Sequence, residues 1–71
     1  MSHLILAQDM VVADIVTHGN RTMLRVCTVR SKTVETEDDE ITFIIATLQA
    51  EGHDRPSRHE FDPHHILTKH N

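Results

Sequence analysis

Residues 11–29, VVADIVTHGNRTMLRVCTV, form two runs of β-forming side chains on either side of Gly19-Asn20. A Gly-Asn pair between such runs indicates a two-residue turn of type II′, because glycine supplies the positive φ that the turn needs. This turn sets the register, and it places Asp14 opposite Arg25 and Ile15 opposite Leu24. The segment therefore predicts an antiparallel hairpin in which the two opposite charges are partners.

A second hairpin is expected around the acidic run ETEDDE at 35–40, because Val, Ile, Thr and Phe are frequent on both sides of it. We expect Thr36 to lie opposite Ile41. The alternation of apolar and polar side chains weakens at Ser31 and Lys32, which predicts a bulge there that lets one strand serve two sheets. The segment SHLILA at 2–7 predicts a further strand at an edge.

The sequence FDPHHILTKHN at 61–71 predicts a short terminal helix over about 63–70. Asp62 is a good N-cap, Pro63 suits the first helical position, and Phe61 can pack on Ile66 as a hydrophobic staple. So short a helix does not persist alone in water, so we expect it to dock on the sheet. The alternative is that RHEF at 58–61 forms a last strand and the rest of the segment stays loose.

A chain of 71 residues forms one domain and buries only about 60% of its unfolded surface, which leaves a thin margin of stability. Apolar side chains are dense as far as residue 48. We therefore expect a single domain over 1–71, with its core in 3–48 and a His-rich tail at 49–71. The predicted fold is mainly β: a small barrel or strongly curved antiparallel sheet, SH3-like or OB-like in size, with a short C-terminal helix.

Catalysis is not expected, and neither is a cofactor. The only glycines, Gly19 and Gly52, form no phosphate-binding loop, and there is no nucleophile elbow. Cys27 is the only cysteine, so it cannot close a disulfide within the chain and is expected to act as a small hydrophobe. These features, with no signal peptide and no apolar run of membrane-spanning length, predict a cytoplasmic protein without membrane contact.

Seven histidines raise the alternative of a metal-binding or pH-responsive protein, since five of them lie in the tail. The paired ligands at short spacing that closed zinc sites show are absent, so no metal site is predicted; His59, His64 and His65 are the weak candidates. A cluster of imidazoles would gain several charges on mild acidification, which is the basis of the pH-responsive reading.

Nucleic-acid binding by a small β-barrel is the main alternative function. The candidate residues are basic: Arg21, Arg25, Arg30 and Lys32. Against it, the chain has no Trp or Tyr and only two Phe for base stacking, and the acidic run would repel a phosphate backbone.

The favoured function is a non-catalytic protein-interaction module that associates with itself. Both faces of the first hairpin carry apolar side chains, and we expect the second face to be covered on so small a monomer, either by the C-terminal helix or by a second copy of the protein. The predicted interface is Val12, Asp14, Val16, Met23, Arg25 and Cys27, with the ion pair fixing the register of the contact. The partner is a protein, foremost a second copy of the chain. The size of the chain suits a phage or mobile-element accessory protein or a small regulator.

Overall fold

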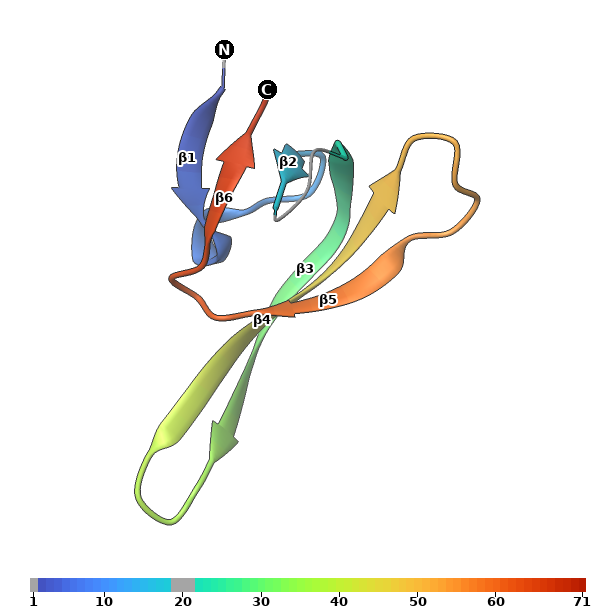
Figure 1. Cartoon of the computed structure of the whole chain (residues 1–71). Coiled ribbons are helices and arrows are strands. Elements are labelled where there is room, and N and C mark those ends of the chain that lie inside the picture. The colour runs from blue at the N-terminus through green and yellow to red at the C-terminus, as the bar shows by residue number, and fades with distance from the viewer. Residues whose placement is uncertain (1, 19–21) are drawn as a thin grey trace.

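The computed structural model describes residues 2–18 and 22–71. Within them the chain is all-β, with one antiparallel sheet in the order β1-β6-β2-β3-β4-β5 and a single 3-10 turn at Ala7–Asp9 (Figure 1). The strands are β1 (His3–Leu6), β2 (Ile15–Thr17), β3 (Leu24–Glu35), β4 (Glu40–Ala50), β5 (Ser57–Phe61) and β6 (Ile66–Lys69). The prediction of a mainly β fold is confirmed, and so is the first strand at an edge.

The sheet does not close, so the prediction of a small barrel is wrong. Closure would need the edge strands β1 and β5 to pair, but β1 pairs with β6 and β5 pairs with β4. Instead the sheet bends around one apolar core, and β3 and β4 continue beyond it as a two-stranded projection (Figure 1). The core cluster consists of Ala7, Met10, Val16, Leu24, Val26, Ile44, Ala46, Leu48, Phe61 and Leu67.

The first hairpin exists, but its register differs from the prediction by one residue. Ile15, not Asp14, lies opposite Arg25, and Val16 lies opposite Leu24. Because side chains alternate between the faces of a sheet, a shift of one residue exchanges the two faces. The observed register buries Val16 and Leu24 together in the core, which favours it. The predicted turn at Gly19-Asn20 lies outside the described residues.

A turn at residues 11–14 explains the shift. The N–H of Asp14 donates to the carbonyl oxygen of Val11 at 3.1 Å, and the N–H of Val11 donates to Oδ2 of Asp14 at 2.9 Å. Ala13 between them has a φ of 79°, a conformation that glycine adopts more readily. The turn interrupts the predicted strand, so β2 begins only at Ile15.

The predicted Asp14–Arg25 pair is therefore wrong. Asp14 is 4% exposed, and its Oδ1 lies 3.1 Å from Nζ of Lys69 on β6. The turn directs this carboxylate to the core face of the sheet, where the ammonium group of Lys69 is the cation within reach.

The second hairpin is confirmed, with a register two residues away from the predicted one. Val34 lies opposite Ile41, and Glu35 lies opposite Glu40. A shift of two residues keeps every side chain on its predicted face. The bulge is not at Ser31 and Lys32: the register shifts between Val26 and Thr28, so Cys27 is the extra residue of β3.

The predicted helix over 63–70 is wrong, because residues Ile66–Lys69 form β6 between β1 and β2. The capping signal is real but local. Asp62 accepts the N–H of His64 at 2.8 Å through Oδ1 and that of His65 at 2.9 Å through its carbonyl oxygen, which makes one turn. Pairing with two strands then satisfies the backbone that a short helix would leave marginal.

The predicted staple between Phe61 and Ile66 is also wrong. Phe61, the last residue of β5, is 7% exposed and lies in the core. Ile66 is 60% exposed, because its side chain lies on the face of β6 that points away from the core. Leu67, the next residue, is buried instead, as the alternation of a strand requires.

Candidate functional site

The arm is the part of β3 and β4 formed by residues 28–47. Its base, residues 28–31 with 44–47, is also paired to β5 and adjoins the core, and residues 32–43 project beyond β5 as two strands (Figure 1). Its strands are joined by backbone pairing and by two hydroxyl contacts, between Thr28 and Thr47 at 2.8 Å and between Thr33 and Thr42 at 3.1 Å. Every residue from 30 to 41 is exposed. The projection gives the molecule its elongated form, with extents of 43 × 27 × 19 Å.

The two faces of the arm differ. Ile44 and Ala46 point to the core, so Ile41, Phe43 and Ile45 point the other way. We call this second side the outer face; it consists of three pairs, Val34 with Ile41, Lys32 with Phe43, and Arg30 with Ile45.

The outer face exposes apolar side chains in a continuous stripe. Val34 is 39% exposed and Ile41 46% exposed, and Phe43 is half-buried beside them. Ile45 is buried outside the main core cluster, at the base of the stripe. A two-stranded ribbon with a bare apolar face is marginal in water, so contact with another surface would stabilise it.

The tip of the arm is strongly acidic. We call residues 35–40 the acidic tip, since five of the six side chains are carboxylates. The backbone there is held in a tight turn, in which the N–H and the Oγ1 of Thr36 both donate to the carbonyl oxygen of Asp39 at 2.8 Å. The turn fixes the negative charges at the far end of the arm.

The base of the arm is basic on the outer face. Arg30 is exposed there, and Arg58 of β5 lies opposite Thr47 on the same face. Glu60 lies opposite Ile45 on the same face and contacts Arg58 at 2.9 Å, with both side chains about half exposed, so it offsets the charge of Arg58 and leaves Arg30 as the positive excess. Lys32 adds a further positive charge between base and tip. The outer face therefore passes from positive charge at the base, through apolar side chains, to negative charge at the tip.

The six predicted interface residues do not share one exposed face. Val16 and Asp14 are buried, whereas Val12 is 58% and Met23 51% exposed. Arg25 is exposed and Cys27 half-buried. The one-residue change of register causes this separation.

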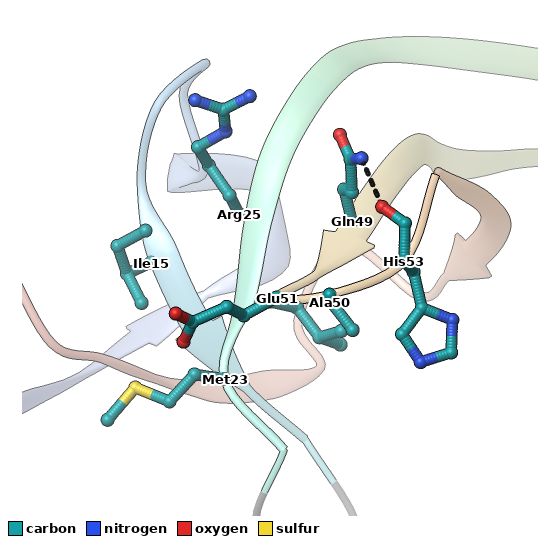
Figure 2. A pocket seen from close by; sticks show the side chains of 9 residues that line it. Ile15, Met23, Arg25, Gln49, Ala50, Glu51 and His53 are labelled. Atoms are coloured by element: carbon teal, nitrogen blue, oxygen red, sulfur yellow. Dashed lines mark hydrogen bonds between the residues drawn. The ribbon is translucent and has the colours of Figure 1, made fainter. Parts of the chain in front are cut away.

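Met23 and Arg25 line an open hollow of about 560 Å³, together with Ile15, Leu24 and residues 49–53 (Figure 2). In Figure 2 the side-chain Nε2 of Gln49 donates to the carbonyl oxygen of His53 at 2.7 Å. This contact fixes the turn that follows β4 along one side of the hollow.

Of the residues predicted for nucleic-acid binding, Arg25, Arg30 and Lys32 lie on one face of β3. Arg25 pairs with Gln49 before the bulge, and the other two belong to the outer face of the arm. Arg21 lies outside the described residues. Phe43, beside Lys32, provides one aromatic ring on that face.

Three imidazoles surround the ring of Phe61. His18 meets it edge-on at 5.2 Å, and His59 and His65 stack against it at 5.9 and 5.3 Å between ring centroids. Burial lowers the pKa of His18 below its ordinary 6.5, and positive charge on His59 and on His65 lowers it further. Protonation of His18 is therefore unfavourable in the folded state.

The three weak metal candidates do not converge on one point. His59 and His65 stack against Phe61, while His64 is exposed and lies 3.7 Å from the carboxylate of Asp62. Within residues 2–18 and 22–71, no group of three or more His, Cys, Asp or Glu side chains is placed to hold a metal ion.

The sequence reasoning missed the outer face of the arm. Its signal was present in the alternation of Val34, Ile41 and Phe43 with polar residues, which marks one apolar face on each strand. What the pattern could not show is that the strands extend beyond the rest of the sheet.

No helix in the described part of the chain has the length and apolar character needed to span a membrane. Comparison with protein-family models, with characterised proteins and with solved structures gave no match.

Proposed function

We propose that the protein is a non-catalytic protein-interaction module that associates with a second copy of itself through the outer face of the arm. The observation that carries the proposal is the apolar stripe on a projecting ribbon, in which Val34 and Ile41 are exposed and Phe43 is half-buried beside them. Contiguous apolar side chains at such a position are typical of an interaction surface. A cytoplasmic location and a regulatory or accessory role stay predictions of the sequence.

A second copy is the favoured partner because two-fold contacts are the commonest arrangement of soluble oligomers, and they place the same patch on both subunits. A domain of this size has little stability to spare, and burying the stripe would add to it. The contact would also hold the two strands of the arm together where no third strand supports them.

The test is the molar mass of the protein in solution, measured by sedimentation equilibrium from low to high micromolar concentrations. We expect a concentration-dependent dimer that Ile41→Glu abolishes, because the carboxylate would be buried in the contact. Ile66→Glu is the matched control: it makes the same change at a 60% exposed isoleucine on β6, and the dimer is expected to survive it. A monomer at every concentration contradicts the proposal, and so does a dimer that Ile66→Glu alone abolishes.

Nucleic-acid binding is the second candidate, favoured by the position of Arg25, Arg30 and Lys32 on one face of β3. The acidic tip at the end of the same strand opposes it, because five carboxylates repel a phosphate backbone. Fluorescence anisotropy with labelled single-stranded DNA and RNA at low salt tests this candidate. Binding that is lost in Arg30→Gln and weakens steeply with salt would support it; unchanged anisotropy would exclude it.

A further inference from the structure

We infer that two copies pack outer face to outer face with their arms antiparallel, so that the acidic tip of each copy lies over the basic base of the other. The inference rests on the proposed self-association and adds the arrangement of the two partners.

Charge separates the antiparallel arrangement from the parallel one. The tip carries five carboxylates within residues 35–40. The base carries Arg30 and also Arg58, whose charge is offset by Glu60, so the positive excess there comes from Arg30. In a parallel contact the two tips would meet, and ten carboxylates in a small volume would repel each other. In an antiparallel contact each tip meets guanidinium groups, and charges of opposite sign steer the partners into that orientation.

The cross-strand pairs of the outer face, each of which forms one row across the arm, fit the same arrangement. When the tip of one arm lies over Arg30 of the other, the two-fold axis falls between the row of Val34 and Ile41 and the row of Lys32 and Phe43. Each copy then places Ile41 against Phe43 of its partner. The arrangement places Ile41 and Phe43 at the centre, beside the long side chain of Lys32, whose ammonium group can reach water at the margin, and it leaves the tip carboxylates and Arg30 at the two ends.

The length of the arm sets the strength of the contact. Eight paired rows, from Thr28 with Thr47 to Glu35 with Glu40, form the arm. At ~3.4 Å per residue and ~4.8 Å between strands, each outer face measures about 27 by 10 Å. Such a contact is smaller than the ~1,200–2,000 Å² of most stable interfaces, so we expect a weak dimer with a dissociation constant in the micromolar range.

The orientation is tested by cross-linking single-cysteine variants of the full chain, in a Cys27→Ser background. Asp38→Cys places a thiol at the tip, and Thr28→Cys places one at the base without removing Arg30. The two variants carry tags of different mass, are mixed near the dissociation constant, and are treated with a short bismaleimide. We expect the tip-to-base product to dominate over the tip-to-tip and base-to-base products.

The charge argument is tested by dimer affinity, measured by sedimentation. Arg30→Glu is expected to weaken the dimer about ten-fold, as is typical of a reversed charge at a complementary interface. Arg55→Glu makes the same change at an exposed arginine between β4 and β5, and we expect an affinity within two-fold of the starting protein. Equal effects of the two variants would overturn the role of Arg30.

The outcomes separate the two proposals. Absence of any dimer contradicts the proposed function. A dimer that depends on Ile41 but gives mainly tip-to-tip or base-to-base product leaves the function standing and overturns the antiparallel arrangement. A dimer with the tip-to-base product and a weakened Arg30→Glu variant supports both.

Discussion

The pair of Asp14 and Lys69 gives the sharpest prediction about the fold, because it distinguishes the observed register from the one that the sequence suggests. The carboxylate of Asp14 is 6% exposed and lies 3.1 Å from Nζ of Lys69, whose side chain is 25% exposed. Lys69→Met removes the ammonium group and keeps most of the apolar stem. It leaves a buried carboxylate that still accepts the N–H of Val11, at 2.9 Å.

The expected loss of stability follows from these contacts. Removal of one partner from a fully buried ion pair destabilises a protein by about 3–5 kcal/mol. Water reaches Lys69 and Val11 still donates to the carboxylate, so we expect Lys69→Met to reduce the free energy of unfolding by about 2 kcal/mol. A domain of this length has a total stability of roughly 4–10 kcal/mol, so the variant should still fold.

The measurement is urea denaturation followed by circular dichroism at one protein concentration, with Arg25→Met as the comparison. Arg25 is exposed and lies opposite Ile15, so its replacement should change the stability by less than about 0.5 kcal/mol. Lys69→Arg should retain most of the stability, because it keeps the positive charge. If Arg25→Met is as destabilising as Lys69→Met, the observed register and this reasoning are both wrong.

Three further predictions concern stability. Burial lowers the pKa of His18 from 6.5, so the unfolded chain binds a proton at this histidine more readily than the folded protein does. The stability that is present above about pH 6.5 is therefore lost as the pH falls below it. Thermal melts from pH 8 to 5 should show this decline, which should be smaller in His18→Phe and as large in His53→Gln as in the starting protein. Ala13→Gly should raise the stability by about 0.5–1 kcal/mol in urea denaturation, because it relieves the positive φ of 79°; a loss would show that the turn is not strained. Leu48→Ala, at a side chain 1% exposed, should lower the stability by about 2–5 kcal/mol, and a change below 1 kcal/mol would contradict the position of the core.

The strands could be predicted from the sequence because runs of Val, Ile and Thr determine them locally. The register of the first hairpin could not, since two alignments that differ by one residue both pair apolar side chains. The choice depends on the turn at 11–14, where Ala13 rather than glycine adopts a positive φ, and on Lys69 from the far end of the chain. Neither feature leaves a local signal.

The C-terminal segment shows the opposite failure. Asp62 and Pro63 are a sound helix-start signal, and the turn that they form is present. The residues after it became a strand because β1 and β2 offer backbone partners on both sides, which a local pattern cannot reveal. Propensity is a weak prior, and tertiary pairing decided the outcome.

The candidate site was predictable in part. The hairpin and its acidic turn follow from the sequence, and the shift of two residues left Val34, Ile41 and Phe43 on the faces that alternation assigns. Their exposure depends on how far the hairpin projects beyond the core. That length is set by where β5 ends, with Phe61 opposite Ile44, and no pattern within the hairpin contains it.

The central claim is that the outer face of the arm is where two copies meet. The most direct test is a dilution series followed by ¹⁵N-¹H correlation spectra, which locates the contact residue by residue. We predict that the amides of Val34, Ile41 and Phe43 shift together with concentration while those of Leu4 and Ile66 stay fixed. Shifts confined to Leu4 and Ile66, or spectra that do not change across the micromolar range, would contradict it.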